Sequence, residues 1–313
     1  MSQPAPEPLP LPGVASPIAA AVLAGGLVWV TWWGLVTTRA GQSLDALALE
    51  GSRVGSWRVD EQADQLLGTV SVPMVAATIV AVLLIGILRG RWLAGVAASV
   101  AVAGANVTTQ VLKYQVFERD DLLKLGTWNG VNTLPSGHTT VAAAGLVGLM
   151  LVVPPVLRSI TTALGVIGVS AYGLATLVNH WHRPSDVAAA ILVACTWGYL
   201  AVAAIRTEER REPVRDVGHR PGAASVILVM FSICGLALTA AAGYMAWNAE
   251  VQGAARTTAF IAYVGGVSAV LAVTCGGLGA LLRLVDASRP IPRERERVEL
   301  GGTVSAPAPM PPA

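Results

Sequence analysis

The sequence predicts an all-α membrane protein, a polytopic transmembrane helical bundle with about eight spans. Composition is the first reason. Of the 313 residues, 54% are hydrophobic and only 13% are charged, whereas soluble domains carry about 25% charged residues. The second reason is the recurrence of apolar runs of about 20 residues, the length that crosses a bilayer. These runs do not alternate polar with apolar residues, and they are too long for the strands of a membrane barrel.

About eight apolar runs satisfy the length rule for a membrane-spanning helix. Each of the three cysteines lies inside such a run, without the spacing of a disulfide framework or a metal site. Helical spans are therefore expected at Pro17–Thr38, Thr69–Leu88, Trp92–Leu112, Thr139–Val156, Ile160–Val178, Ser185–Ile205, Ala223–Trp247 and Thr258–Leu282.

The Lys and Arg residues of the connections predict which way the helices face, because cytoplasmic connections are enriched in them. The connection after the sixth run is the most basic, with Arg206, Arg210, Arg211, Arg215 and Arg220. We therefore expect both termini inside and the connections 39–68, 113–138 and 179–184 outside. The net charge is only +2, and no basic run is interleaved with aromatic residues. Nucleic-acid binding is therefore not expected.

Two cations follow the third run directly, in Lys113-Tyr-Gln-Val-Phe-Glu-Arg119. At a membrane surface they can converge on one anion, because Lys supplies a compact charge and Arg a planar fork that matches phosphate oxygens. Taken alone, the same pair is also typical of an interfacial anchor.

Pro135-Ser136-Gly137-His138 opens the fourth run. Ser136 is a good helix cap, and Gly137 allows the backbone to approach a ligand closely. The N–H groups and the dipole at the helix start then form an anion site. His138 lies at the edge of that site and can donate a proton to a leaving oxygen. In isolation, a plain turn with an incidental His fits this run equally well.

The run Asn179-His180-Trp181-His182-Arg183-Pro184-Ser185-Asp186 leads into the sixth span. Pro184 suits the first turn of a helix, and Asp186 lies in that turn, four residues after His182. Its carboxylate can accept from Nδ1–H of His182, which leaves Nε2 unprotonated for attack or for proton abstraction. A capping carboxylate beside interfacial histidines is the alternative. Ionisable residues at span ends tend to be functional, however.

The order of these motifs resembles the type 2 phosphatidic acid phosphatase superfamily. That family's pattern is Lys-x6-Arg-Pro, then Pro-Ser-Gly-His, then Ser-Arg-x5-His-x3-Asp. Residues 135–138 match the second motif fully, and His182 and Asp186 match the spacing of the third. The Pro-Ser-Asp after His182 looks like bacterial members. The resemblance covers roughly residues 60–206 and implies a six-helix core.

Two departures from the family pattern concern phosphate binding. Lys113 and Arg119 are one residue closer together than in the family, and an Asp follows Arg119 in place of the Pro. At the Ser-Arg positions of the third motif the chain has Ala175 and Thr176, so the family's phosphate-binding Arg is missing there. Arg183, beside the presumed nucleophile, is the nearest cation that can substitute for it.

Covalent catalysis is what the resemblance implies. His182 attacks phosphorus and forms a phosphohistidine, while Asp186 holds its ring. His138 protonates the departing lipid oxygen and then activates water. No cofactor and no metal are expected, because the acids near the motifs are few and scattered. The residues expected to bind the substrate's oxygens are Lys113, Arg119, Ser136, Gly137 and Arg183.

Five segments are expected along the chain. A disordered tail (1–14) precedes the catalytic transmembrane domain (15–206). A basic cytoplasmic linker (207–222) connects that domain to two additional transmembrane helices (223–284). A second disordered tail (285–313) ends the chain.

The function implied is that of a phosphatase in a bacterial cytoplasmic membrane, with its active site on the extracytoplasmic face. Its partner is a lipid phosphate or diphosphate, with polyprenyl diphosphate, phosphatidic acid and phosphatidylglycerophosphate left open. One alternative is a phosphotransferase that passes phosphate to a lipid or sugar acceptor. Another is a catalytically degenerate lipid-binding protein, which the missing Arg favours and the retained His138, His182 and Asp186 oppose. The sequence does not indicate the oligomeric state.

Overall fold

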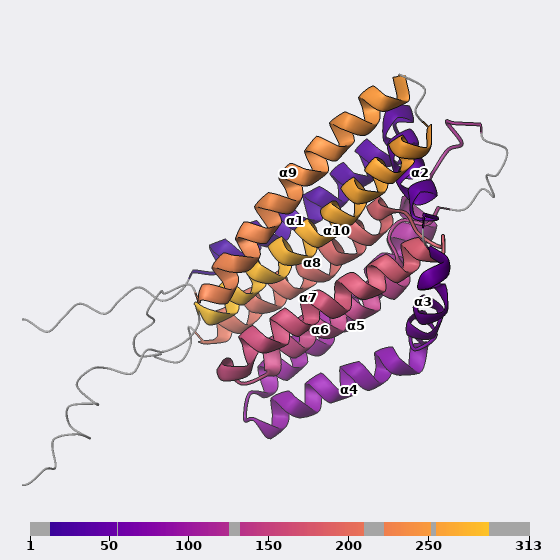
Figure 1. The fold of residues 1–313 in the computed structure, drawn as a ribbon. Coiled ribbons are helices and arrows are strands. Elements are labelled where there is room, and N and C mark those ends of the chain that lie inside the picture. The colour runs from indigo at the N-terminus through magenta and orange to yellow at the C-terminus, as the bar shows by residue number, and fades with distance from the viewer. Residues whose placement is uncertain (1–12, 55, 125–131, 210–221, 252–254, 288–313) are drawn as a thin grey trace, which may run out of the picture.

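The computed structural model describes residues 13–54, 56–124, 132–209, 222–251 and 255–287. Every regular element within these ranges is helical, which confirms the all-α class (Figure 1). The predicted tails 1–14 and 285–313 and the predicted linker 207–222 lie almost entirely outside the described residues. In chain order the elements are α1 (Ala15–Leu35), α2 (Arg39–Gly51), η1 (Ser56–Arg58), α3 (Asp60–Leu67), α4 (Val72–Leu88), α5 (Trp92–Val111), η2 (Leu112–Val116), α6 (Gly137–Val152), α7 (Pro155–Val178), α8 (Pro184–Glu209), α9 (Ala223–Val251) and α10 (Ala255–Asp286).

Each predicted apolar run is helical, but fewer helices than expected are long enough to cross a membrane. Six are long and apolar enough in the described chain: α1, α5 with η2, α7, α8, α9 and α10. Helices α4 and α6 have 17 and 16 residues, or about 24–26 Å at 1.5 Å per residue, against a hydrocarbon core of about 30 Å. Helices α3 and α4 qualify together as a pair bent by 62°, which makes up to seven spans. By length and composition the described residues thus provide six or seven spans, against the about eight expected.

The connection 39–68, which is expected outside, is mostly helical rather than an open loop. Thr38 caps α2 by accepting from the Gly41 N–H at 3.0 Å, and two acids occupy the first turn of α3, where they complement the helix dipole. Helix α2 packs against α10, α1 and α8. Figure 1 shows α2 and α3 at the same end of the bundle. This end therefore carries a layer of short helices over the long ones.

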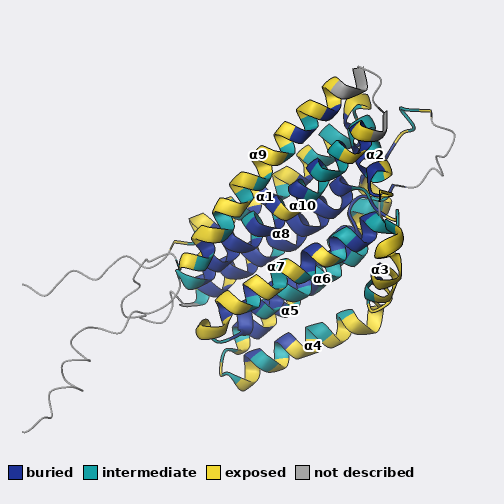
Figure 2. Ribbon diagram, viewed as in Figure 1, coloured by how far each residue is buried: buried dark blue, intermediate teal, exposed yellow. Residues whose placement is uncertain are grey.

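Helix α8 is the central helix of the bundle and the most buried of the candidate spans (Figure 2). It packs against α1, α5, α6 and α10. Its buried face is rich in alanine, including Ala189, Ala190 and Ala194, and small side chains allow helices to approach closely within a membrane. Because α8 is held on several sides, its first turn is fixed in place. Helix α9, by contrast, exposes large apolar side chains such as Phe231 along its length.

The segment after α5 is directed inward by aromatic packing against α1. Element η2 is a π-helix that continues α5, and π-helices are frequent at functional sites. Phe117, the residue after η2, is buried and stacks on Trp32 with a centroid distance of 5.0 Å. The Trp32 Nε1–H donates to the Glu118 carbonyl at 3.1 Å. These contacts anchor the chain where it leads into Arg119.

Candidate active site

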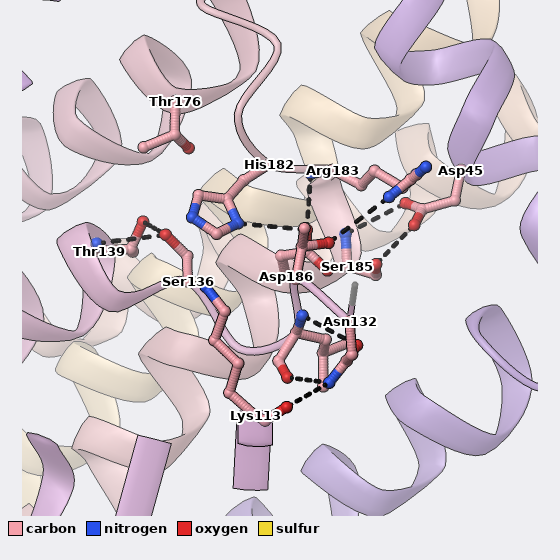
Figure 3. A network of polar contacts seen from close by, with 12 residues as sticks. Asp45, Lys113, Asn132, Ser136, Thr139, Thr176, His182, Arg183, Ser185 and Asp186 are labelled. Carbon is pink, nitrogen blue, oxygen red and sulfur yellow. Dashed lines mark hydrogen bonds and ion pairs between the residues drawn. The ribbon is translucent and has the colours of Figure 1, made fainter. Parts of the chain in front are cut away.

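Three segments that are distant in sequence meet at one end of the bundle (Figure 3). They are the end of α5 with η2, the start of α6, and the connection from α7 to α8. The amide of Asn132 joins the first two, since it donates to the carbonyls of Lys113 at 3.2 Å and of Leu134 at 2.7 Å. The Ser136 N–H joins the second and third by donating to the Asp186 carbonyl at 2.9 Å. The three predicted motifs therefore form one site.

Ser136 caps helix α6, as the sequence predicts. Its hydroxyl is fully buried and accepts from Thr139, at 3.4 Å from the backbone N–H and 3.1 Å from the side-chain hydroxyl. The first N–H groups of a helix have no partner within the helix, and the helix dipole makes them attractive to anions. In Figure 3 the side chain of Lys113 points toward Ser136. A cation and a helix N-terminus thus face the same space.

His182 is buried, and its ring contacts the carboxylate of Asp186. The distance from Nδ1 to Oδ2 is 3.3 Å, as the four-residue spacing predicts. Since an ionised carboxylate can only accept, this contact selects the tautomer with its proton on Nδ1, in which Nε2 carries the free lone pair. The His182 backbone is also held, because its N–H donates to the Thr176 carbonyl at 3.2 Å. The arrangement is that of an oriented nucleophile or general base.

The Asp186 carboxylate is fully engaged. Oδ2 accepts the Arg183 N–H at 2.9 Å in addition to the His182 ring. Oδ1 accepts from Nη2 of Arg119 at 3.2 Å. Only 1% of the Arg119 side chain is exposed. The sequence predicts that Arg119 contacts the substrate; in the structure its guanidinium contacts Asp186.

His138 lies close to His182 and contacts the ring of Trp181. The His138 and Trp181 rings are 5.3 Å apart between centroids. His138 is half-buried and lies within electrostatic reach of both His182 and Lys113. The predicted acid–base residue and the predicted nucleophile are therefore neighbours.

The two positions discussed for the missing family arginine differ in environment. Thr176 is fully buried, and its hydroxyl donates to the Gly173 carbonyl at 2.7 Å, so it contributes to the turn that holds His182. Arg183 is half-buried, and its Nη1 lies 3.5 Å from the Thr133 hydroxyl. Of the two residues, Arg183 alone carries a charge that a phosphate can use.

His180 lies apart from this network. It adopts a left-handed backbone conformation with φ of 58°, and its Nε2 is 3.5 Å from the Ser52 hydroxyl at the end of α2. Partial burial, with a further contribution from the positive charge of Arg53, lowers the pKa of His180. Its neighbours belong to α2 rather than to the phosphate-facing space.

Sequence reasoning missed two polar residues of the site, Asp45 and Asn132. Asp45 interrupts the apolar run Leu44-Asp45-Ala46-Leu47 within a connection that carries none of the three motifs. A lone acid on the apolar face of a short helix is a signal of a buried partner, since buried charges are paired. Asn132 has no comparable signal, because its role depends on bringing two distant backbone segments together.

Comparison with known proteins agrees with the motif order. The family model described as PAP2 superfamily matches residues 94–210, a range that contains the three motifs and helices α6 to α8. Searches of curated proteins and of solved structures found no match. Residues 94–210 are thus similar to the PAP2 superfamily, that of the type 2 phosphatidic acid phosphatases.

Proposed function

We propose that the protein is a phosphatase that hydrolyses a membrane lipid phosphate or diphosphate through a phosphohistidine intermediate on His182. The match of residues 94–210 to the PAP2 superfamily supports phosphatase activity in general. One observation carries the finer proposal. The buried contact of 3.3 Å between His182 and Asp186 lies beside the N-terminus of α6, so a nucleophile and an anion site adjoin.

The first chemical step transfers the phosphoryl group to the enzyme. Nε2 of His182 forms a bond to phosphorus as the bond from phosphorus to the lipid oxygen breaks, and His138 gives that oxygen its proton. Positive charge develops on the His182 ring during this step. The ionised Asp186 stabilises it through Nδ1.

The second step regenerates the enzyme. Water attacks phosphorus and gives a proton to His138, while the bond between phosphorus and Nε2 of His182 breaks and inorganic phosphate leaves. Charge on the equatorial oxygens is stabilised in both steps by Lys113, by Arg183 and by the N–H groups at the start of α6, where Ser136 and Gly137 lie. Arg119 acts through Asp186.

A groove between α4, α6 and α7 supports a lipid substrate. It has a volume of about 370 Å³ and is lined almost entirely by apolar residues. Val141 and Ala142 in its wall follow His138 by three and four residues, so they lie on the same face of α6 as His138. With the phosphate at the site, the groove is placed to hold the hydrocarbon chain, because burial of apolar surface is favourable.

Filling this groove is expected to weaken the binding of long-chain substrates selectively. Gly168 lines the groove, and a Cβ added there meets no atom within 4 Å, so the Gly168→Leu side chain is expected to occupy the groove. Displacing one or two methylene groups of the substrate should raise KM about 10-fold for a long-chain lipid phosphate. KM for a short-chain, water-soluble analogue should be unchanged.

Gly26→Leu on α1 is the matched control. Gly26 also has no neighbour within 4 Å of an added Cβ, and it gains the same helix propensity. This control should leave both KM values unchanged. An equal KM for the long-chain substrate in Gly168→Leu and in the unsubstituted enzyme would rule out the groove as its binding site.

We further propose that the site faces the outside of a bacterial cytoplasmic membrane, because the most basic connection follows α8. In a chain whose three native cysteines are replaced by Ala, Glu61→Cys should react with an impermeant thiol reagent in intact cells. Arg211→Cys should react only after the membrane is permeabilised. The reverse labelling pattern would place the active site inside.

Phosphate release from a panel of lipid phosphates and diphosphates, by purified protein in detergent, tests the proposed function. Each assay is run with and without a lipid or sugar acceptor. Free phosphate in both conditions supports hydrolysis, whereas phosphate found on the acceptor would identify a phosphotransferase. Lipid binding without any phosphate transfer would identify the degenerate lipid-binding alternative, which the absence of Arg at Thr176 favours.

A further inference from the structure

Asp45 of helix α2 is a buried carboxylate outside the three motifs that contacts the machinery of the site. Only 2% of its side chain is exposed. Figure 3 shows it across Ser185 from Asp186. Its place depends on how α2 packs over the end of the bundle against α8 and α10.

Two hydrogen bonds join Asp45 to the start of α8. The Ser185 N–H donates to Oδ1 at 3.2 Å, and the Ser185 hydroxyl donates to Oδ2 at 2.6 Å. Ser185 is the second residue of α8, so its N–H is one of those without a partner within the helix. Asp45 therefore caps, from another helix, the turn that carries Asp186. A carboxylate at a helix N-terminus is also favoured by the helix dipole.

Asp45 also shares Arg119 with Asp186. Nη1 of Arg119 lies 4.0 Å from Oδ2 of Asp45, and Nη2 lies 3.2 Å from Oδ1 of Asp186. All three side chains are at least 98% buried. The charges of Asp45, Arg119 and Asp186 are thus negative, positive and negative in that order. The last of them is the carboxylate that holds the His182 ring.

We propose that Asp45 is a positioning residue for the reaction: it holds Arg119 and the first turn of α8 so that Asp186 keeps its place and its negative charge beneath His182. This inference rests on the proposed function. With Asp45 ionised, the three groups carry a net charge of −1 at the His182 ring. With Asp45 neutral the net charge is zero, and Arg119 is drawn wholly to Asp186.

The expected effect is on turnover rather than on substrate binding. Asp45 does not face the space where the phosphate binds, but it governs how well Asp186 stabilises the positive charge that develops on His182. A charge-assisted contact altered in this indirect way corresponds to about a 10-fold fall in kcat. KM should change by less than about twofold.

Titration of Asp45 gives a second readout. Burial, and then the negative charge of Asp186, raise the pKa of Asp45 from 3.8 to about 6, against the opposing effects of Arg119, Ser185 and Arg183. Helix α10, which packs against α2, contributes the titratable side chain of Tyr263, and this residue lies near Gly51, further along α2. As pH falls through about 6, Asp45 takes up a proton and kcat should fall with it. Protonation is the same loss of charge that Asp45→Asn makes permanent.

The same shift predicts that Asp45→Asn folds. A carboxyl group whose pKa is higher in the folded state than in the unfolded state favours folding most when it is protonated. Its contribution to stability declines as pH rises from about 4 to about 6. At neutral pH the fold therefore tolerates a neutral side chain at position 45, and an amide oxygen can still accept from Ser185.

The experiment compares kcat, KM and the pH profile of kcat for Asp45→Asn, Asp45→Glu and the control Glu50→Gln. Glu50 is an exposed acid on the same helix, and it pairs with Arg53 at 3.2 Å. Asp45→Asn should show a kcat about 10-fold lower at neutral pH, and a smaller decline of kcat near pH 6 than the unsubstituted enzyme. Asp45→Glu should recover part of kcat and restore that decline, and Glu50→Gln should match the unsubstituted enzyme.

An active enzyme whose Asp45→Asn variant keeps full kcat and the decline near pH 6 would overturn this inference and leave the proposed function intact. A rise in KM that accounts for the whole loss would also overturn it, since it would place Asp45 in substrate binding. An unsubstituted protein that releases no phosphate from any lipid phosphate would overturn the proposed function, and this inference with it.

Discussion

Replacing His182 with Asn should abolish turnover, whereas the same substitution at His180 should leave most of it. Without the His182 imidazole there is no nucleophile for the first step, and the loss is expected to be at least about 10⁴-fold in kcat. His180 contacts Ser52 of α2 instead of Asp186. Steady-state phosphate release by the two purified variants makes the comparison.

Asn is the informative choice at both positions. At His180 the backbone φ of 58° is a left-handed conformation that Asn tolerates and Ala does not favour. At position 182 the Asn amide can still donate to Asp186, which protects the fold. Full activity in His182→Asn, or inactivity in a folded His180→Asn, would reverse the assignment of the nucleophile.

Replacing Asp186 with Asn should be almost as severe, with kcat lower by about 10⁴-fold. An amide can present its NH₂ group to Nδ1 of His182, which selects the wrong tautomer, and it removes the charge that stabilises the imidazolium. The substitution also leaves Arg119 with Asp45 alone, at 4.0 Å. Breaking a buried ion pair on one side destabilises a protein by about 3–5 kcal/mol, so Tm should fall as well.

Asp64→Asn is the matched control for this prediction. Asp64 lies on α3 and accepts a hydrogen bond from Asn179 at an exposed position. It should retain both activity and Tm. If Asp186→Asn lost stability but kept kcat, Asp186 would be a structural residue, and the orientation of His182 would have to come from its backbone contacts.

The helical content was predictable because a span must be continuously apolar, and such runs are visible in composition alone. The lengths were less predictable. Helix α6 ends at Val152, where Arg89 donates to the carbonyl and Pro154 follows. The sequence shows the Pro but not the distant Arg. The helices α2 and α3 are short and amphipathic, so the rule for spans does not detect them.

Within the site, the spacing of residues along the sequence predicted the contacts that depend on local backbone geometry alone. His182 and Asp186 are four residues apart at the start of a helix, and that spacing alone brings a ring and a carboxylate together. The positions of Arg119 and Asp45 depend instead on packing between elements distant in sequence. Asp45 meets Ser185 across 140 residues of chain. No sequence pattern reveals a contact between residues that far apart in the chain.

The most direct test of the covalent mechanism is to trap and map the phosphoenzyme. Purified protein is mixed with a lipid phosphate labelled in the phosphoryl group, quenched rapidly at alkaline pH, and digested for mass spectrometry. The mechanism predicts an acid-labile phosphoryl group on His182 that is absent from His182→Asn. Phosphate mapped to His180, or hydrolysis at full rate with no phosphoenzyme under conditions that preserve phosphohistidine, would contradict it.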